Sequence, residues 1–297
     1  MTIAFISDIH LDFWISIKLT GQKENKQLDE FISYVLKPKK ADILIIAGDN
    51  SHYNQQFKKL LMKLTELKLF KKIFVTYGNH DLYLISNKQI HDYKISINKI
   101  AEMKQICNDI DDVEFLDGNI IDVDGIKIGG CAMWYDYSYG KKNFNMNDFH
   151  MLQKWKQVMN DANYIYGTDH LGLNEVRSMY SYGKTKIYTF DPLLFFESEK
   201  DKLLKIIDEV DIFVSHFGPA IPPNLESKYM NIDTGFYYFD GEHYLWNEKA
   251  PKLWIFGHTH TKYEWKVNNT WMVSNPLGYK SENTNVSIEI IDLNNLY

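Results

Sequence analysis

This sequence of 297 residues contains little arginine and little cysteine, and it has no excess of positive charge. Arg177 is the single arginine among 33 basic residues, so a guanidinium clamp on a phosphate must use that residue, or metal ions must replace it. Cys107 and Cys131 are too few for a disulfide framework and lack the spacing of a zinc site, so we expect two buried free thiols. A net charge of −6 gives no overall attraction to nucleic acid or to an anionic membrane.

Long hydrophobic runs are missing as well. Asp8 interrupts the first apolar stretch and the first lysine is Lys18, which does not match a secretion signal. The longest aliphatic runs, such as residues 43–47, are far shorter than the roughly 20 residues that cross a bilayer. We therefore expect a cytoplasmic protein without a membrane partner. No repeat or linker divides the sequence, so residues 1–297 are expected to form one domain.

Short aliphatic runs alternate with amphipathic segments along the first third of the chain. Apolar residues at helical spacing predict helices over 28–35 and 57–67, and each follows a strand candidate. This order of strand, helix and strand is typical of an α/β fold. Strands are predicted at residues 3–6, 43–47, 73–77, 113–116, 120–123, 126–130, 212–215, 253–256, 263–267, 271–274 and 286–291.

The middle of the chain has a different composition. A helix is predicted over 90–106, and another begins at Ser198 with a Ser-x-x-Asp pattern. Between them, residues 134–196 carry scattered tyrosines and one predicted helix, so we interpret this segment as a cap or insertion that selects the substrate. Trp134 and Arg177 are its candidate contacts. The aromatic residues from Trp134 to Tyr139 could stack on a nucleobase or pack beneath the cap, and we favour packing.

Metal-capable side chains follow five of the predicted strands where each strand ends. Ligands of open α/β sheets bind beyond the carboxyl ends of strands, so we expect these five ends to meet at one site. Each motif alone has an ordinary explanation, such as a helix cap or a loop histidine, whereas five together favour a shared function. The motifs are Asp8-Ile9-His10, Gly48-Asp49, Gly78-Asn79-His80-Asp81, Ser215-His216 and Gly257-His258-Thr259-His260.

The side chains in these motifs are carboxylates, an amide and imidazoles, without a thiolate. Such ligands favour manganese, iron or zinc. Seven of them exceed the needs of one ion, whereas two ions about 3.5–4 Å apart, bridged by one carboxylate, would use all seven. We therefore predict two divalent transition-metal ions, with manganese favoured over iron or zinc.

In their order, the five motifs resemble the signature of the calcineurin-like metallophosphoesterase superfamily, from Asp8 to His260. The resemblance implies a four-layer α/β/β/α sandwich with two mixed β-sheets. It also implies hydrolysis of a phosphomonoester or phosphodiester by a metal-bridging hydroxide. The metal ligands that it implies are Asp8, His10, Asp49 and His260 at one ion and Asp49, Asn79, His216 and His258 at the other, with Asp49 as the bridge.

His80 is not a metal ligand by this resemblance. It would donate a proton to the leaving oxygen or stabilise charge on the phosphoryl oxygens. Asp81 would be the partner that orients its ring, and a neighbouring carboxylate is expected to raise the pKa of His80.

The sequence also departs from some branches of the superfamily. Its Gly-Asp motif continues as Asn50-Ser51-His52, without the arginine of the protein phosphatases, so a phosphoprotein substrate is disfavoured and a small phosphoester is expected. His52 faintly resembles a histidine of the nuclease branch, although we favour a solvent-facing loop residue. Four other histidines, His91, His150, His170 and His243, match no motif and are expected at the surface.

Two alternatives stay open. The enzyme could be a nuclease or a cyclic-nucleotide phosphodiesterase, although the net charge does not support a nucleic-acid partner. The chain could also be a non-catalytic scaffold of the same fold. Retention of all seven ligand positions disfavours a scaffold, because converging charges and imidazoles are costly to bury without a function.

Overall fold

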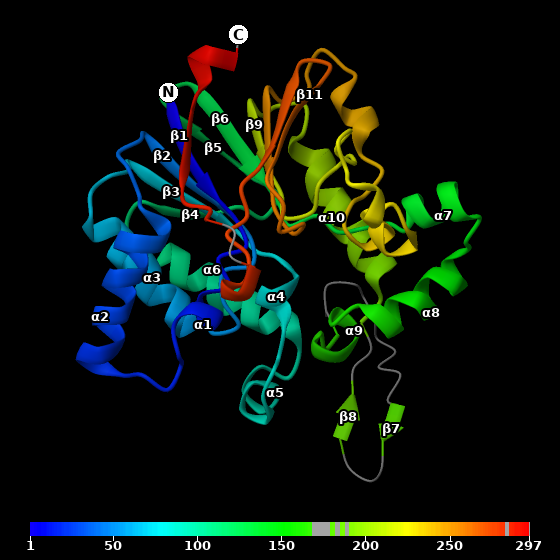
Figure 1. The fold of residues 1–297 in the computed structure, drawn as a ribbon, viewed down its shortest axis with the longest axis horizontal. Coiled ribbons are helices and arrows are strands. Elements are labelled where there is room, and N and C mark those ends of the chain that lie inside the picture. The colour runs from blue at the N-terminus through cyan, green and yellow to red at the C-terminus, as the bar shows by residue number, and fades with distance from the viewer. Residues whose placement is uncertain (168–178, 182–184, 188–189, 283–284, 297) are drawn as a thin grey trace.

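The computed structural model describes residues 1–167, 179–181, 185–187, 190–282 and 285–296. Two mixed β-sheets form its centre, and the N- and C-termini lie at the same end of the molecule (Figure 1). No helix among these residues is long and apolar enough to span a bilayer. Cys107 and Cys131 are buried free thiols, as predicted.

The first sheet has the strand order β13-β1-β2-β3-β4. Its strands are parallel except β13, which is antiparallel to β1. Every residue of β2 is buried, as is typical of a strand covered on both faces in an α/β sheet. The strands are β1 (Thr2–Ile6), β2 (Ile43–Ala47), β3 (Lys72–Thr76), β4 (Val113–Phe115) and β13 (Glu289–Asp292).

The second sheet has the order β11-β12-β10-β9-β6-β5. Its four central strands are parallel, and an antiparallel strand flanks them on each side. Strands β7 (Met179–Ser181) and β8 (Thr185–Ile187) form a separate antiparallel pair. The strands of the second sheet are β5 (Asn119–Val123), β6 (Ile126–Gly130), β9 (Ile212–Val214), β10 (Leu253–Phe256), β11 (Tyr263–Val267) and β12 (Thr270–Ser274).

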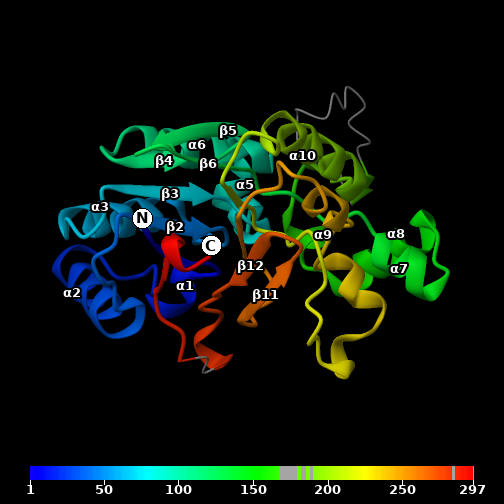
Figure 2. The same ribbon diagram turned by 90° about the horizontal axis from the view of Figure 1, so that it is seen from above.

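The two sheets pack face to face through apolar side chains. Along β1, Ile3 and Phe5 join a cluster that also contains Ile128 and Ile255 of the second sheet. Ala4, on the opposite face of β1, belongs to the larger apolar cluster, which also contains buried side chains of the helices. This alternation follows from the two-residue period of a strand. Helices α2 and α3 lie beside the first sheet and α10 beside the second (Figure 2), which confirms the predicted four-layer arrangement.

Three predicted helices differ from the structure. The helix predicted over 28–35 begins at Gly21, and the chain continues as a π-helix over Ile32–Leu36. Lys94, with φ of 68°, divides the segment predicted as one helix into α5 and α6. Helix α10 begins at Pro192 instead of Ser198, because the Asp191 side chain caps the backbone N–H groups of Leu193 and Leu194. The helices are α1 (Leu11–Trp14), α2 (Gly21–Phe31), α3 (Asn54–Glu66), α4 (Asn79–Leu82), α5 (Asn87–Tyr93), α6 (Ser96–Asn108), α7 (Ser138–Phe144), α8 (Asp148–Val158), α9 (Asp161–Tyr164) and α10 (Pro192–Ile206).

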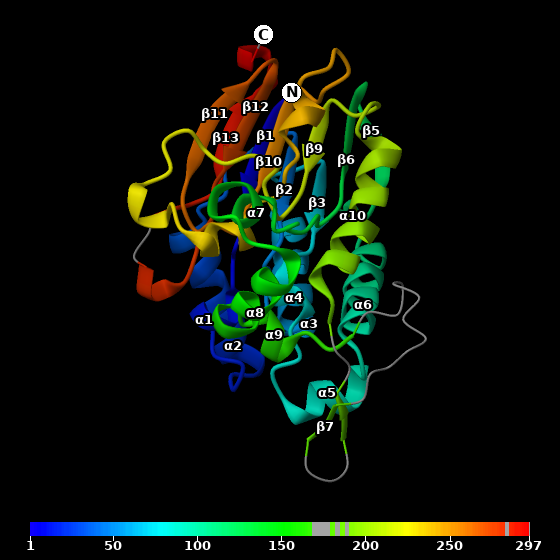
Figure 3. The same cartoon turned by 90° about the vertical axis from the view of Figure 1, so that its right-hand side faces the viewer.

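Shorter helical turns complete the chain. The segment after β9 contains three 3-10 turns, and one of them, η4, packs against α7 and α8 (Figure 3). Helices α7, α8 and α9 and the β7-β8 pair lie between β6 and α10 in the sequence, within the segment predicted as an insertion. The turns are η1 (Ile32–Leu36, a π-helix), η3 (Ser227–Tyr229), η4 (Ile232–Phe236), η5 (Glu242–Leu245), η6 (Lys280–Glu282) and η7 (Leu293–Leu296).

Candidate metal centre

The ends of five strands bring the predicted ligands together. The loops after β1, β2 and β3 in the first sheet meet the loops after β9 and β10 in the second. The parallel order of these strands places their carboxyl ends at one edge of the double sheet, as the motif positions predict. The side chains that meet there are Asp8, His10, Asp49, Asn79, His80, His216, His258 and His260.

The backbone at these strand ends is unusual. Five of the seven predicted ligands have positive φ angles, which residues other than glycine rarely adopt. The strain of such residues is typical of functional sites, where surrounding structure holds them in place. They are Asp8 (52°), His10 (44°), Asp49 (54°), His258 (71°) and His260 (49°).

Two glycines allow the strands to approach this closely. A Cβ atom at Gly48 would lie 2.5 Å from His216 Nδ1, and Gly48 also has a φ of 86°. A Cβ atom at Gly257 would lie 2.6 Å from Asp8 Oδ2. Because real Cβ atoms do not come so near, a larger residue at either position would displace a predicted ligand.

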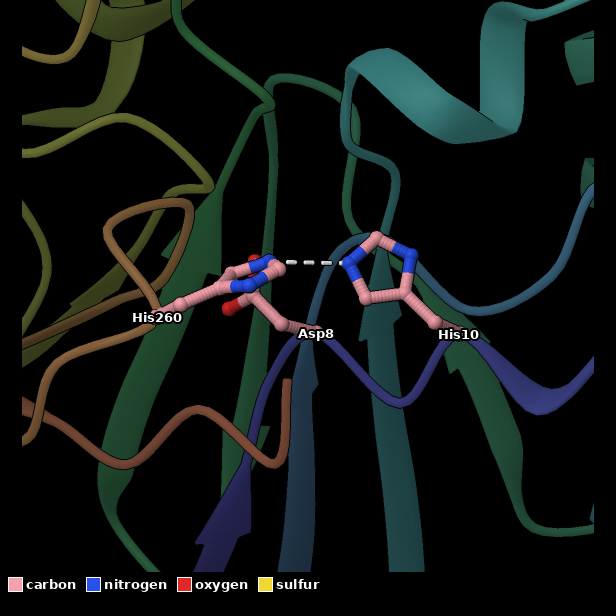
Figure 4. Close-up of side chains that lie close together, drawn as sticks. All are labelled: Asp8, His10 and His260. Carbon is pink, nitrogen blue, oxygen red and sulfur yellow. Dashed lines mark hydrogen bonds and ion pairs between the residues drawn. The ribbon is translucent and has the colours of Figure 1, made fainter. Parts of the chain in front are cut away.

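Asp8, His10 and His260 lie close enough to share one cation (Figure 4). His10 Nε2 is 2.9 Å from His260 Nε2, and His260 Nε2 is 3.4 Å from Asp8 Oδ1. Asp49 Oδ2 is 3.6 Å from His10 Nε2. Two ring nitrogens at this separation repel each other unless a proton or a cation lies between them, so the arrangement fits a metal ion.

A second group contains Asp49, His216 and His258. His216 Nε2 is 3.4 Å from Asp49 Oδ2 and 3.2 Å from Asn79 Oδ1. Asp49 therefore faces ligand nitrogens of both groups through the same oxygen, Oδ2. This is the position that a bridging carboxylate needs.

Hydrogen bonds orient the imidazoles of the second group. His216 Nδ1 is 2.9 Å from the Ala47 carbonyl oxygen, and His258 Nε2 is 3.2 Å from the Phe236 carbonyl oxygen. A carbonyl oxygen only accepts, so the nitrogen that faces it donates and the opposite nitrogen keeps its lone pair. Nε2 of His216 and Nδ1 of His258 are thereby left for a metal ion.

Glu282 orients His260 in the same way, and sequence reasoning missed it. Its Oε2 lies 2.9 Å from His260 Nδ1, which leaves His260 Nε2 to face Asp8. A carboxylate behind a ligating histidine is a frequent partner in metal sites. Glu282 follows β12 and belongs to none of the strand-end motifs, so no local signal pointed to it.

Asp161 is a second partner that the sequence did not reveal. It is fully buried, and its Oδ1 accepts hydrogen bonds from Asn79 Nδ2 at 2.8 Å and from the Tyr83 hydroxyl at 2.6 Å. Its Oδ2 accepts from the Tyr135 hydroxyl at 2.7 Å. Because the Asn79 amide nitrogen is held by Asp161, the amide oxygen faces His216 and the centre.

The buried carboxylates attract positive charge to the centre. Burial alone would lower the pKa of His216, but Asp49, Asp8 and the Ala47 carbonyl together outweigh burial and raise this pKa to about 9. Burial is likewise outweighed at His260, where Asp8 raises the pKa to about 9. Burial opposes ionisation of Asp49, yet His216 holds its pKa well below the usual value. Protons on two imidazoles balance these carboxylates at neutral pH, and divalent cations would replace those protons.

His80 sits beside the predicted ligands in a chain of hydrogen bonds. Its Nδ1 lies 3.0 Å from His52 Nε2, and its Nε2 lies 3.2 Å from the Tyr279 hydroxyl. His52 Nδ1 in turn lies 2.8 Å from Asp12 Oδ2. His52 is buried, so the prediction of a solvent-facing loop residue is wrong.

The predicted role of Asp81 also needs correction. Its carboxylate accepts hydrogen bonds from the backbone N–H groups of Gly78 and Asn50 and from the Asn50 side chain, and these bonds shape the loop instead of orienting the His80 ring. Asp12, through His52, is the carboxylate that supports His80. The expected increase in the pKa of His80 is wrong too, because burial outweighs the attraction of Asp49 and lowers this pKa well below its usual value.

Trp134 does not reach the site, contrary to the hypothesis that it contacts substrate. Its side chain is fully buried and packs against Phe190, Phe195 and Phe217. This packing agrees with the favoured interpretation that the aromatic residues lie beneath the cap. Arg177 and His170 lie outside the described residues. His91, His150 and His243 are exposed, as predicted.

A cavity of about 610 Å³ opens onto the centre. Four predicted ligands, Asp49, Asn79, His258 and His260, line it together with His80. The end of α8 and the residues after it contribute to the wall, so part of the 134–196 segment borders the cavity. A small phosphoester could therefore reach the ligands directly.

The comparison with known families decides the assignment. The profile of the calcineurin-like phosphoesterase family matches residues 1–262. The chain belongs to the calcineurin-like phosphoesterase family. The family match extends over all five strand-end motifs, so the predicted recognition is confirmed.

Individual relatives are distant. An uncharacterized protein of Acanthamoeba polyphaga mimivirus is 21% identical over 293 residues, which cover 95% of this chain and 92% of that protein. The phosphopantetheinyl hydrolase of Mycobacterium tuberculosis has a similar fold, with a TM-score of 0.64, 14% identity and coverage of 97% of this chain and 95% of that chain. The calcineurin-like phosphoesterase YfkN of Bacillus subtilis gives a TM-score of 0.39 at 13% identity, over 92% of this chain and 80% of that chain.

Proposed function

We propose that this chain hydrolyses small phosphomonoesters or phosphodiesters with the help of two divalent transition-metal ions, manganese first among them. The observation that supports the proposal most directly is the position of Asp49 Oδ2, which lies 3.6 Å from His10 Nε2 and 3.4 Å from His216 Nε2. One oxygen between two groups of ligands is suited to a pair of ions. The family match supports a phosphoester as the substrate class.

The residues present fit two such ions. Asp8, His10 and His260 would hold one, Asn79, His216 and His258 would hold the other, and Asp49 would be shared. Bound divalent ions would polarise the phosphoryl group and activate water for attack. The donor set contains oxygen and imidazole nitrogen without a thiolate, which suits manganese, iron or zinc.

His80 would act on the substrate as a neutral imidazole. Its lowered pKa leaves the ring uncharged at neutral pH, so it offers one N–H group. Because the Asp12 carboxylate accepts from His52 Nδ1–H, His52 Nε2 accepts the N–H of His80 at Nδ1. His80 lines the cavity and would present Nε2 to it as a proton acceptor. The hydrogen bond to His52, itself held by Asp12, limits rotation of the ring and keeps it in position.

The experiment is reconstitution of the purified protein with manganese, followed by elemental analysis and an assay with paired aryl phosphate mono- and diesters. We expect about two equivalents of metal and hydrolysis that a chelator abolishes. Asp49→Asn should lower metal content and activity together. Asp124→Asn, on the exposed turn between β5 and β6, is the matched control and should change neither.

Four results would overturn the proposal. A stoichiometry that stays at one ion would contradict a shared Asp49, and hydrolysis that survives chelation would contradict a role for metals. A protein that binds two ions but hydrolyses no phosphoester would be a scaffold. Cleavage of a DNA or RNA oligonucleotide in preference to aryl phosphates would favour the nuclease alternative.

A further inference from the structure

The cavity above the predicted ligands has no cationic group of its own among the described residues. Besides those ligands, the ionised side chains that line it are Asp233 and Glu282, both acidic. Glu282 is engaged with His260 at 2.9 Å, and Asp233 pairs with Lys154 at 3.2 Å. The described part of the wall therefore offers no lysine or arginine to a second anionic group of a substrate.

Tyrosine rings make up much of the remaining wall. Tyr237 and Tyr279 are half-buried next to predicted ligands: the Tyr237 ring is 4.8 Å from the His258 ring, and the Tyr279 ring is 4.7 Å from the His260 ring. Such rings offer an apolar face for stacking and a hydroxyl for hydrogen bonding. The six tyrosines of the wall are Tyr83, Tyr229, Tyr237, Tyr238, Tyr263 and Tyr279.

We propose that this cavity binds the leaving group of the substrate, and that it selects an uncharged alcohol that carries a ring, of the nucleoside or phenol class. The proposal rests on the proposed function, because it concerns the half of the phosphoester that the metal ions do not hold. Water attacks phosphorus, the bond from phosphorus to the alcohol oxygen breaks, and the alcohol leaves with a proton while the phosphate keeps the new oxygen.

Two physical effects give this selection. A ring gains contact with tyrosine faces and excludes water, which favours ring-bearing alcohols over small alkyl ones. An additional carboxylate or phosphate on the leaving group would lose its hydration near Asp233 and Glu282, and no lysine or arginine among the described wall residues would pair with it. Because the leaving group stays in the cavity as the bond breaks, both effects act on kcat/KM.

The test uses the manganese-loaded protein and three monoesters, with the same leaving groups as methyl diesters in parallel. These are 4-carbamoylphenyl phosphate, 4-carboxyphenyl phosphate, which is nearly the same size but carries one more charge, and ethyl phosphate, which lacks a ring. We expect kcat/KM for the carbamoyl ester to exceed that for the carboxy ester at least about tenfold, since the added carboxylate would be desolvated beside Asp233 and Glu282, which have the same sign of charge. Ethyl phosphate should be the poorest of the three, in part because its alkoxide is a poorer leaving group than a phenolate, so the ring effect is judged from the change in the ratio of aryl to ethyl ester on Tyr237→Leu.

Two variants separate the charge effect from the ring effect. Asp233→Asn removes an acidic group and releases Lys154, so the ratio of carbamoyl to carboxy ester should fall severalfold. Tyr237→Leu should lower kcat/KM for both aryl esters and bring them nearer to ethyl phosphate, and Tyr229→Leu, at a more exposed ring, should act in the same direction if Tyr237→Leu fails to fold. Tyr34→Leu, at a ring that is 74% exposed and outside the cavity, is the matched control.

The outcomes distinguish the two proposals. If none of the esters is hydrolysed, the proposed function fails. If the esters are hydrolysed but the carboxy ester is as good as the carbamoyl ester, or ethyl phosphate equals the aryl esters, the cavity does not select in this way. A ratio unchanged by Asp233→Asn would also overturn the charge argument.

Discussion

Asp161→Asn should weaken one of the two metal sites and spare the other. Asp161 holds Asn79 through a hydrogen bond of 2.8 Å, and Asn79 belongs with His216 and His258. An asparagine has nearly the same volume as aspartate, and its single amide oxygen can still accept from Asn79 and Tyr83. The bond to Asn79 loses the carboxylate charge, however, and bonds to a charged acceptor are roughly twice as strong as neutral ones.

The expected magnitude follows from these contacts. A hydrogen bond to a charged group contributes about 1.5–3 kcal/mol and a neutral one about 1 kcal/mol, so the hold on Asn79 weakens by about 1 kcal/mol or more. Changes in outer partners of metal ligands typically cost 10–100-fold in metal affinity. We therefore expect manganese affinity at the Asn79 site to fall about 10–100-fold, with little change at the site of Asp8, His10 and His260.

Calorimetric titration of metal-free protein with manganese measures both affinities. Tyr135→Phe is the matched control, because it removes the 2.7 Å bond to the other carboxylate oxygen and leaves the bond to Asn79 in place. Thermal unfolding of the metal-free variants reports any general loss of stability. Equal effects of Asp161→Asn and Tyr135→Phe on metal affinity, or equal losses at both sites, would refute the reasoning.

Four further predictions concern His80, the protons at the metal centre, the pH dependence of stability and the core residue Trp134. His80→Ala should retain the metal ions but lower kcat by about 10²–10⁴-fold, and His52→Ala should have a smaller effect of the same kind. Loss of metal from His80→Ala would contradict the placement of His80 beside the ligands. Metal binding at pH 7 should release about two protons, from His216 and His260, because both have pKa values raised to about 9. Calorimetry in buffers of different ionisation enthalpy measures the number of protons released. Metal binding without proton release would be inconsistent with these pKa shifts. The raised pKa values of His216 and His260 should also stabilise the metal-free fold. This stabilisation is complete below about pH 6.5 and is lost as the pH rises through about 9. Thermal unfolding should therefore occur at a lower temperature at pH 9.5 than at pH 7. Trp134→Ala should destabilise the protein by about 3–5 kcal/mol through loss of core packing, without changing the preference among aryl phosphates. A changed preference with unaltered stability would instead indicate that Trp134 contacts the substrate.

The stability of the metal-free fold should also fall on the acidic side. His10 has a pKa lowered to about 4 and His258 one lowered to about 3, mainly by burial. Both must remain neutral in the folded chain, whereas they take up protons near pH 6.5 when unfolded. Their contribution to stability is therefore lost as pH falls below about 6.5. Metal-free protein should be most stable near neutrality.

Local patterns in the sequence predicted the architecture well. The strands of both sheets follow short aliphatic runs, and β2 corresponds to its predicted range, Ile43–Ala47. Errors occurred where one residue controls the backbone: Lys94 breaks a helix by adopting a positive φ, and Asp191 starts α10 before Ser198. Apolar periodicity carries no information about such single positions, because it reports which face is buried and not where a chain turns.

The sequence by itself determined which residues follow the strand ends. Asp8, Asp49 and His216 could be placed at one edge because parallel strands direct their carboxyl ends the same way, and the five motifs are short enough to recognise locally. Only the tertiary structure decided what holds each of these side chains. Asp161 reaches Asn79 across 82 positions of the chain, and Asp12 reaches His52 across 40.

Those partners carry no local sequence signature. The sequence records only the residue type, so a buried aspartate that accepts three hydrogen bonds cannot be told from an exposed aspartate. Asp81 shows the converse, because its neighbour His80 in sequence is not its partner in space. Hydrogen bonding selects partners by distance and direction after packing is complete. Strand ends are set by periodicity along the chain, whereas the support of the site is set by contacts between elements that only folding brings together.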